Sequence, residues 1–193
     1  MRNKEFKHDV ALKKAMHLFW QKGYENTSLK ELLKEMGILN GSFYNSFGNK
    51  KSLFIDILKF YDEDFVAKRN FVFKADKPFK KKIRYFFRHL FDRQQGAVCP
   101  KGCLLFNSVS SETINDIDIY KQIRSSIGNF EDFLCYEIEK AMKNKELDKH
   151  IDPKMTASVL VAYVQGMMKL STLDYNDTKF RSQTDYFLSS LGL

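Results

Sequence analysis

Apolar residues recur at helical spacing from the beginning of the chain. Between residues 5 and 22 they form one stripe, which consists of Val10, Ala11, Ala15, Leu18 and Phe19. Gly23 follows where a helix would end, because glycine readily adopts the left-handed backbone that closes a helix. The pattern therefore predicts one amphipathic helix followed by a turn.

A second, shorter helix is predicted between Thr27 and Gly37. Thr27 suits the N-cap, and Ser28 with Glu31 has the spacing of a capping box. The stripe that we expect to be buried consists of Leu29, Leu32, Leu33 and Met36. A helix N-terminus with a hydroxyl cap also suits an anion, so Thr27 and Ser28 are candidates for phosphate contact. For Ser28, a capping role alone is the alternative.

The residues after Gly37 predict a third helix with two different faces. Ile38, Phe43 and Phe47 have the spacing of core anchors, whereas the open side carries Asn40, Gly41, Ser42, Tyr44 and Asn45. Asn can bond adenine through two hydrogen bonds, and Ser can bond most base edges. Two short helices joined at a glycine, the second with one polar face, have the layout of a helix-turn-helix. This motif places its second helix in the major groove of DNA.

A fixed set of spacings in this segment resembles the TetR family of bacterial transcriptional repressors. The matching positions are Gly41, Phe43, Tyr44, Phe47, Lys50 and Leu53, with Gly23, Tyr24, Thr27 and Ser28 upstream. The resemblance implies that Tyr44 and Lys50 contact phosphates and that Asn40, Ser42 and Asn45 lie against the groove. The complete set of predicted DNA-binding residues is Thr27, Ser28, Asn40, Gly41, Ser42, Tyr44, Asn45, Lys50 and Lys51.

Two residues depart from the pattern of the family. Leu39 stands where the family usually has Ser or Thr as the N-cap of the recognition helix, and losing a cap costs about 1 kcal/mol. Asn40 is an alternative cap, in which case the helix begins one residue later and Asn40 is less free to read bases. Lys51 stands where an acidic residue is common. A cation opposes the dipole of a first helical turn, which is easier to explain if Lys50 and Lys51 both approach phosphate.

The rest of the chain predicts an all-α second body without strands. Asn49 is expected to cap a long helix from Lys50 to about Phe71, shared by both bodies. The further predicted helices cover residues 78–94, 103–113, 116–145, 153–173 and 177–191, with a loop over 95–102 and about nine helices in all. The predicted domains are residues 1–54, a helix-turn-helix DNA-binding domain, and residues 55–193, a helical effector-binding and dimerisation domain.

Composition and charge fit this division. The hydrophobic content of 44% is globular, and the 18 Phe residues exceed what a small DNA-binding domain needs. Residues 1–60 contain 11 Lys and Arg against six Asp and Glu, a net charge of +5, whereas residues 61–193 contain 21 against 18, a net charge of +3. Such a basic N-terminal part suits phosphate neutralisation. No apolar run approaches the ~20 residues of a membrane span and no signal-peptide core is present, so we expect a cytoplasmic protein.

An effector pocket is expected in the second body, because TetR-like proteins usually hold a ligand there. The predicted lining is Phe86, Phe87, Leu90, Phe106, Phe130, Phe133, Tyr163 and Met167. These side chains favour an apolar or aromatic effector, and no charged cluster indicates a charged one. For each residue, plain core packing is the alternative. The basic face of residues 78–94 is interpreted as solvated and not as a second DNA contact.

Cys103 is the candidate thiol sensor among three cysteines. It is predicted at a helix start beside Lys101, and both features lower the pKa of a thiol. The stretch from Gly102 to Leu104 resembles a branch of the family that responds to electrophiles or oxidants, with Cys99 as a possible resolving thiol. The alternative is a buried structural cysteine, which is what we expect of Cys135.

The resemblance also implies a homodimer through residues 153–173 and 177–191, reading a palindromic double-stranded DNA operator. The scattered histidines predict no metal site, and no cofactor or enzymatic motif is found. We therefore predict a repressor that a small apolar or thiol-reactive effector releases. The rival interpretation is an all-helical ligand-binding or protein-interaction module that no longer binds DNA, favoured by Leu39 alone.

Overall fold

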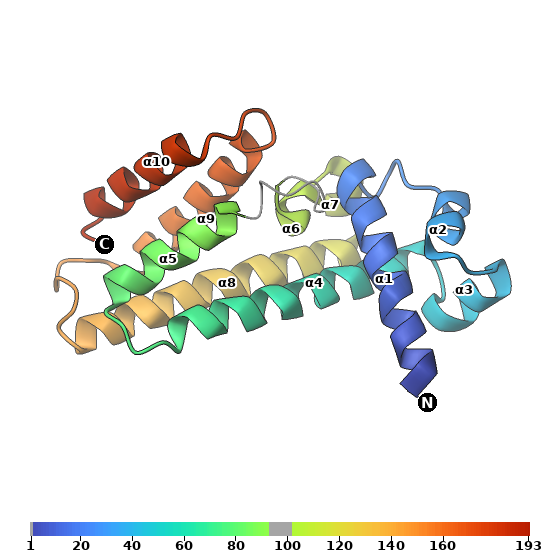
Figure 1. Ribbon diagram of the computed structural model, residues 1–193, viewed down its shortest axis with the longest axis horizontal. Helices are drawn as coiled ribbons and strands as arrows, with labels where there is room; N and C mark the ends of the chain where they lie inside the picture. The colour runs from blue at the N-terminus through green and yellow to red at the C-terminus, as the bar shows by residue number, and fades with distance from the viewer. Residues whose placement is uncertain (1, 93–101) are drawn as a thin grey trace. The chain divides into compact units, whose positions relative to one another are not determined.

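The computed structural model describes residues 2–92 and 102–193, and the predicted all-α fold class is confirmed (Figure 1). The described residues contain no strand and form ten helices. These are α1 (Arg2–Lys22), α2 (Leu29–Met36), α3 (Asn40–Phe47), α4 (Lys50–Phe73), α5 (Phe79–Asp92), α6 (Leu104–Asn107), α7 (Ser111–Asn115), α8 (Ile117–Lys143), α9 (Pro153–Leu170) and α10 (Asp177–Ser190). None of them combines the length and the apolar character that a bilayer crossing requires.

The single short helix expected over residues 103–113 is instead two helices, α6 and α7. The Ser108 hydroxyl donates a hydrogen bond to the Leu104 carbonyl oxygen at 2.7 Å, at the end of α6. Ser110 then starts α7 through a capping box with Thr113, and its backbone is extended, with φ −138° and ψ 170°. An N-cap residue cannot also continue the preceding helix, so the two helices are separate.

The chain forms two compact units. The first unit comprises Met1–Glu63 together with Leu104–Ser126, and the second comprises Asp64–Cys103 together with Ile127–Leu193. Both α4 and α8 begin in the first unit and end in the second. The first unit therefore includes residues 104–126, which lie far along the chain from α1 to α3.

Aromatic rings form much of the core of the first unit. The rings of Phe19 and Tyr24 lie 4.9 Å and 4.8 Å from the ring of Phe54, between centroids. The buried face of α1 consists of Ala11, Leu12, Ala15 and Phe19. The prediction that Val10 belongs to this stripe is wrong, because Val10 is 41% exposed. Each step along an α-helix turns the side chain by about 100°, and the face centred on Leu12 leaves Val10 outside.

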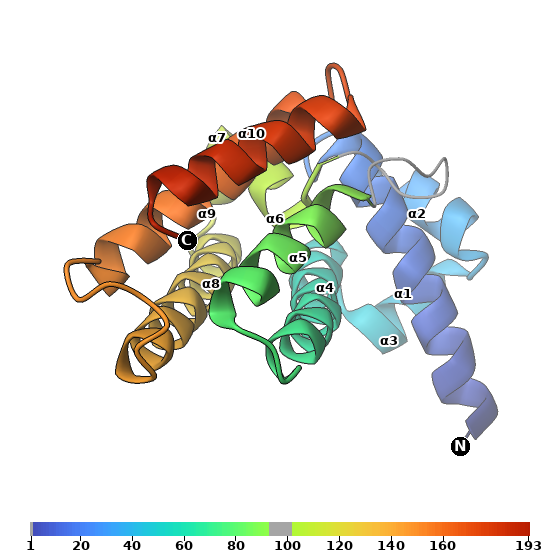
Figure 2. The ribbon, with the colours of Figure 1, turned by 60° about the vertical axis from the view of Figure 1, so that its left-hand side comes forward.

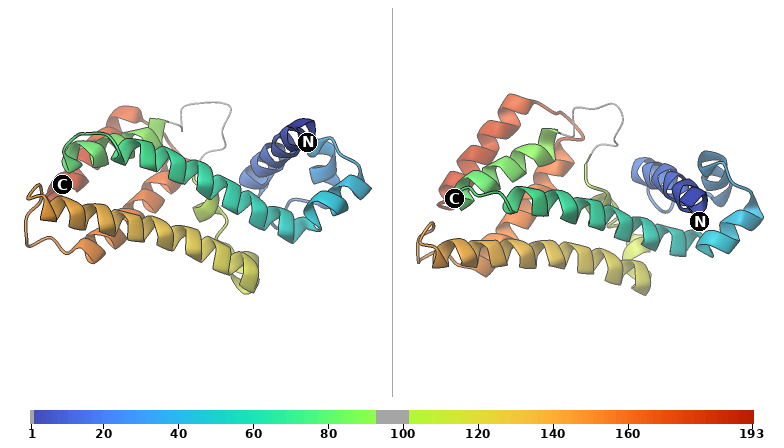
Figure 3. Two further views of the ribbon diagram at one scale, coloured as in Figure 1. Left: turned by 90° about the horizontal axis from the view of Figure 1, so that it is seen from below. Right: turned by 60° about the horizontal axis from the view of Figure 1, so that its bottom comes forward.

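Aromatic contacts also fill the second unit. Phe73 of α4 meets Phe133 of α8 edge to face at 5.0 Å, and the C-terminal parts of these helices run side by side in both views of Figure 3. Phe86 of α5 lies 5.6 Å from Phe73 and 5.9 Å from Phe130. The phenylalanines of the second unit are thus largely used in packing helix against helix.

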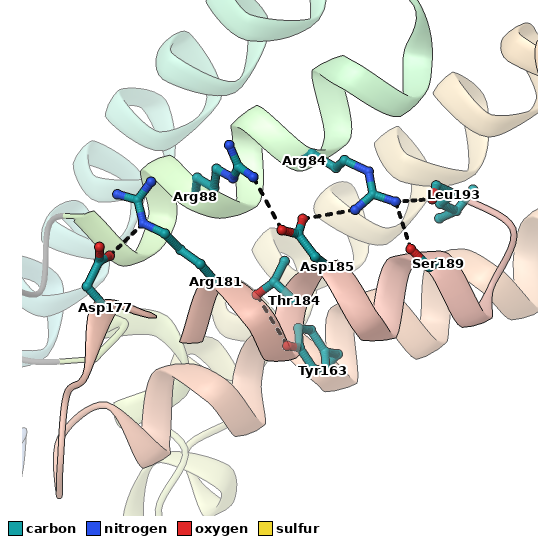
Figure 4. Close-up of polar contacts among 9 residues, drawn as sticks. All are labelled: Arg84, Arg88, Tyr163, Asp177, Arg181, Thr184, Asp185, Ser189 and Leu193. Carbon is teal, nitrogen blue, oxygen red and sulfur yellow. Dashed lines mark hydrogen bonds and ion pairs between the residues drawn. The ribbon is translucent and has the colours of Figure 1, made fainter. Parts of the chain in front are cut away.

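The helices α5 and α10 lie side by side (Figure 2), and an arginine and aspartate cluster joins them (Figure 4). Arg84 donates to Asp185 Oδ1 at 2.9 Å, and its other terminal nitrogen donates to Ser189 Oγ at 3.0 Å and to the Leu193 carbonyl oxygen at 2.8 Å. Arg88 donates to Asp185 Oδ2 at 3.3 Å. One carboxylate therefore binds two guanidinium groups. The basic face of α5 is not simply solvated, since two of its five cations have partners on another helix.

The N-terminus of α5 is capped from a distant part of the chain. The Phe79 amide donates to Glu146 Oε2 at 2.6 Å, although the two residues are 67 positions apart. A carboxylate at this end of a helix is favoured by the exposed amides and by the helix dipole. Glu146 thus links the segment after α8 to the beginning of α5.

Candidate nucleic-acid interface

The helix α2 begins with a capping box formed by Ser28 and Glu31, as predicted. The Ser28 amide and hydroxyl donate to Glu31 Oε2 at 2.9 and 2.7 Å, and the Glu31 amide donates to Ser28 Oγ at 3.3 Å. Lys22 at the end of α1 forms an ion pair with the same carboxylate. Hydrogen bonds from Lys22 and Ser28 lower the pKa of Glu31 to about 2. This corner is therefore an ordered, ionised link between α1 and α2.

Thr27 does not cap α2, so that prediction is wrong. Its side chain is completely buried, and its hydroxyl donates to the Gly23 carbonyl oxygen at 2.7 Å. The N-cap is Ser28, one residue later, whose extended backbone presents its hydroxyl to the amide of the third helical residue. The Thr27 hydroxyl closes the preceding turn instead, and it is not accessible to phosphate in this structure.

The helix α3 buries its aromatic anchors and exposes a polar face. Phe43 and Phe47 are buried, with ring centroids 5.8 Å apart. The exposed residues are Asn40, Gly41, Ser42, Tyr44 and Asn45, and Tyr44 is 49% exposed. A Cβ added to Gly41 would meet no atom within 4 Å beyond its immediate surroundings. The packing of the chain itself therefore does not require glycine there, which leaves an approaching surface as a reason.

Leu39 occupies the N-cap of α3 without making a side-chain hydrogen bond. Its backbone is extended, with φ −81° and ψ 157°, and its side chain is 81% exposed. The alternative in which Asn40 caps the helix is wrong, because α3 already begins at Asn40. The exposed Asn40 amide in the first turn is thus not committed to capping.

Lys50 at the start of α4 lies beside an aromatic ring. Its ammonium nitrogen is 4.4 Å from the centroid of the Tyr24 ring, which is a cation–π contact. Asn49 caps the helix, as predicted, by accepting a hydrogen bond from the Ser52 amide at 2.8 Å. Beyond the position of Tyr24 after Gly23, nothing in the sequence indicates this contact. The contact restricts where the Lys50 charge lies.

Lys51 is paired within the first unit. Its ammonium nitrogen lies 2.6 Å from Asp118 Oδ2 and 3.1 Å from Asp116 Oδ1. Hydrogen bonds to Asp118 and then to Asp116 raise the pKa of Lys51. The cation in the first turn of α4 is therefore compensated by carboxylates of the same protein. This differs from the prediction that Lys51 approaches phosphate.

A second polar link joins the turn after α1 to α7. Glu25 Oε1 accepts hydrogen bonds from the Ser110 hydroxyl at 2.9 Å and from the Glu112 amide at 3.2 Å. Together with the Lys51 ion pairs, this contact fastens the helix-turn-helix to residues 104–126 of the same unit. Neither contact is evident in the sequence, because the partners are far apart along the chain.

Two sequence models of protein families match this chain. The model described as bacterial regulatory proteins of the tetR family matches residues 11–57. The model described as a tetracyclin repressor-like C-terminal domain matches residues 80–187, which is more than half of the chain. The chain belongs to the TetR family. It is therefore a transcriptional regulator and not an enzyme.

Similar sequences and solved structures agree with this assignment. This TetR-family chain is 31% identical over 171 residues to the HTH-type transcriptional repressor ComR of Escherichia coli (strain K12), covering 86% of the chain and 80% of ComR. It is 29% identical over 147 residues to the HTH-type transcriptional regulator YezE of Bacillus subtilis (strain 168), covering 76% of each protein.

Among solved structures, the TetR family transcriptional regulator CifR, a cysteine mutant complexed with 26-bp double-strand operator DNA, superposes with a TM-score of 0.84. The two sequences are 21% identical, and the match covers 92% of this chain and 93% of CifR. Reduced E. coli NemR gives a TM-score of 0.80 at 18% identity, covering 92% and 94% of the chains. At these identities the likeness establishes the TetR fold.

The residues predicted to line an effector pocket are mainly packed against one another. Five are buried and three, Phe106, Phe133 and Tyr163, are half-buried. Ring contacts connect Phe87 to Phe86 at 5.9 Å and to Tyr163 at 6.0 Å. Phe106 belongs to the first unit, whereas the other seven belong to the second. This close packing is also what the alternative of plain core predicts.

The cysteines have different surroundings. Cys103 directly precedes the four-residue helix α6 and is half-buried, whereas Lys101 and Cys99 lie outside the described residues. Cys135 of α8 is half-buried and not fully in the core, with its sulfur 3.9 Å from Glu139 Oε1. Burial, together with the Glu139 carboxylate, raises the pKa of the Cys135 thiol.

Proposed function

We propose that this TetR-family regulator is a repressor that binds a palindromic double-stranded operator as a homodimer. The observation that carries the proposal is the exposed polar face of α3, next to the Lys50 charge beside Tyr24. Tyr44, Lys50 and Ser28 contact phosphates in this proposal, and Gly41 allows close approach. The base edges are read by Asn40, Ser42 and Asn45. Repression takes place in the cytoplasm, where a bacterial operator lies.

In this proposal, DNA binding and effector binding are assigned to the two predicted domains. Residues 1–54 contain all the proposed DNA contacts, and residues 55–193 supply effector binding and dimerisation. Lys51 joins the DNA contacts only if phosphate replaces Asp116 and Asp118 as its partner, since its charge is already neutralised. We therefore rank Lys50 above Lys51 as a phosphate ligand.

Selection of DNA sequences with the purified full chain tests the proposal. We expect a palindrome to be enriched, and its affinity is then measured by fluorescence anisotropy. Lys50→Ala should weaken all sequences similarly and reduce the slope of log affinity against log salt by about 1, because one phosphate contact is lost. Asn45→Ala should change sequence preference. The control is Lys59→Ala, which removes the same charge from an exposed position of α4.

The absence of an enriched DNA sequence would contradict the proposal. If no sequence is enriched at low salt, the chain does not bind DNA, and the rival interaction module is favoured. The exposed Leu39 at the front of α3 is the observation that favours this alternative. If Lys59→Ala and Lys50→Ala weaken binding equally, the DNA contact is a general charge effect and not the specific interface proposed.

The proposed homodimer uses α9 and α10, within residues 153–173 and 177–191. An apolar and small stripe is exposed along α9, where Met155 and Leu170 are 63% and 52% exposed. Ala162 and Gly166 lie on the same stripe at helical spacing, and a Cβ added to Gly166 meets no atom within 4 Å. A partner helix could thus approach closely there.

Light scattering after size exclusion tests the dimer. We expect Gly166→Arg to be monomeric at a concentration where the wild type is dimeric, because the new side chain blocks close approach of helices. Ala67→Arg introduces the same charge at an exposed position of α4 and should leave the dimer intact. Circular dichroism confirms that both variants fold. A dimeric Gly166→Arg variant would place the interface elsewhere.

We further propose that an effector releases the operator, either by reacting with Cys103 or by entering the second unit without a covalent bond. The apolar candidates for the second route are Phe86, Phe87, Leu90, Phe130, Phe133, Tyr163 and Met167. In the test, N-ethylmaleimide is added to the operator complex of the wild type, Cys103→Ser and Cys135→Ser. Release from the wild type and Cys135→Ser, with retention in Cys103→Ser, supports the thiol route. Retention in all three contradicts it.

A further inference from the structure

A groove of about 960 Å³ lies in the second unit between the end of α4 and α5. Apolar side chains in its lining include Phe71 and Tyr85, which are 77% and 47% exposed. None of the residues predicted from the sequence as an effector pocket lines this groove. It is therefore a separate feature from the packed aromatic interior.

The lining of this groove carries a large excess of positive charge. It contains six cations, Lys74, Lys77, Lys81, Lys82, Arg84 and Arg88, and one carboxylate, Asp76. Arg84 and Arg88 share the carboxylate of Asp185 on α10 (Figure 4). Among the residues that the structure describes, the four lysines have no carboxylate within ion-pair distance. The protein thus leaves most of this charge uncompensated.

A neighbouring groove has a smaller excess of positive charge than the groove of about 960 Å³. The second groove, about 490 Å³, shares Lys74, Lys82 and Asp76 with the first. It also contains Glu137, which is only 8% exposed and lies 4.0 Å from Lys140. A buried carboxylate therefore offsets part of the positive charge there, whereas the larger groove contains no buried acid.

We propose that the larger groove binds a small amphipathic anion, a carboxylate or phosphate attached to an apolar chain or ring. Its volume lies within the ~300–1,000 Å³ typical of small-molecule sites. The exposed rings of Phe71 and Tyr85 supply apolar surface, and the lysine ammonium groups supply compact charges for the head group. The hollow lies between only two helices, which suits a small ligand better than an extended polyanion.

This assignment goes beyond the proposed repressor function, and it differs from the expectation of an uncharged effector. The expectation came from the interior aromatic residues. The sequence predicts a solvated face for the lysines of α5 because it does not show that α4 ends beside them. The structure brings Phe71 of α4 and the lysines of α5 to one groove.

Fluorescence titration with dansyl-undecanoate and with its neutral methyl ester tests the proposal on the full chain without DNA. We expect the anion to bind about tenfold more tightly than the ester, a difference of about 1.4 kcal/mol. Lys81→Glu should remove this preference while leaving ester binding unchanged. Lys80→Glu is the matched control, because Lys80 is exposed on the same helix but does not line the groove.

Equal affinities for the anion and the ester, or equal losses in Lys80→Glu and Lys81→Glu, would overturn the proposal. Displacement of the probe by a single-stranded oligonucleotide would also overturn it, because a polyanion would then be the preferred occupant. Displacement by dodecanoate or dodecyl phosphate supports it, and the tighter competitor identifies the head group. Since no DNA is present, failure here leaves operator binding untouched.

Discussion

The helix α2 in the first unit of this TetR-family regulator and the helix α5 in the second are held by contacts of different range. In the first unit, Ser28 and Glu31 cap α2 from three residues apart, and Gly37 closes it in a left-handed conformation, with φ 69°. In the second unit, α5 is capped by Glu146 from 67 residues away, and Arg84 binds a carboxylate 101 residues away. The ends of α2 are thus specified by residues close in the sequence, whereas α5 depends on contacts that close only in the folded chain.

The largest expected effect tests whether the two units unfold together. Phe54→Ala in the first unit and Phe87→Ala in the second should each cost about 3–5 kcal/mol, because both rings are completely or almost completely buried. Phe71→Ala, at a position 77% exposed, is the matched control and should cost little. Urea unfolding is followed by circular dichroism and by the fluorescence of Trp20, the single tryptophan, in α1.

Both core variants should lower the midpoint reported by Trp20, because α4 and α8 belong to both units. If Phe87→Ala shifts the dichroism but leaves the Trp20 signal unchanged, the units unfold independently. The two units would then be separate folding units.

A smaller effect isolates one distant contact. Asp185→Asn removes the charge shared by Arg84 and Arg88 and should lower stability by about 1 kcal/mol, the upper end for partly exposed ion pairs. Asp174→Asn, an exposed acid before α10, is the control. The measurement is the urea midpoint at low and high salt. An unchanged midpoint would mean that the charge of Asp185 does not help to hold α10 to α5, where Arg84 also donates to Ser189 and to the Leu193 carbonyl oxygen.

A local change of similar size should act in the opposite direction. Leu39→Ser supplies a hydroxyl at an N-cap that already has the extended backbone for it, so we expect a gain of about 0.5–1 kcal/mol. Leu39→Ala removes the apolar side chain without adding a cap and is therefore the reference. Equal thermal midpoints for the two variants would show that the first turn of α3 gains nothing from a cap.

The smallest effect is a pH dependence of the capping box. The pKa of Glu31 is lowered from 4.5 to about 2, so its stabilisation is present above pH 4.5 and is lost as the pH falls towards 2. Thermal midpoints of the wild type and Glu31→Gln should therefore differ most above pH 4.5 and converge near pH 2. Glu35→Gln, an exposed position on α2 without a capping role, is the control. A difference that is constant with pH would contradict the ionic contribution.

Most of the fold could be predicted from local patterns. The caps at Ser28 and Asn49 are each recognisable from a polar side chain placed before an apolar helical stripe, and both accept the expected backbone hydrogen bond. The polar face of α3 also followed from periodicity alone. These features depend on residues three or four apart, which a sequence shows directly.

The features that could not be predicted depend on contacts between residues far apart in the chain, or on a shift of one residue in where a helix begins. The separation of α6 and α7 rests on competing caps at Ser108 and Ser110, and the burial of Thr27 rests on the path of the preceding turn. The ion pairs of Lys51 with Asp116 and Asp118 depend on the placement of the start of α8 beside α4, which the sequence does not show. Similarly, no local pattern brings Phe71 and Lys81 to one groove.

The contacts of Glu25 and Lys51 have a consequence for building chimaeric regulators. A junction placed after residue 54 transfers both side chains but leaves behind Ser110 and the Asp116 and Asp118 carboxylates that they contact. The transplanted domain would then carry an acid and a lysine facing whatever residues the host supplies. A graft that carries residues 104–126 together with the N-terminal part keeps both contacts and therefore transfers the complete structural module.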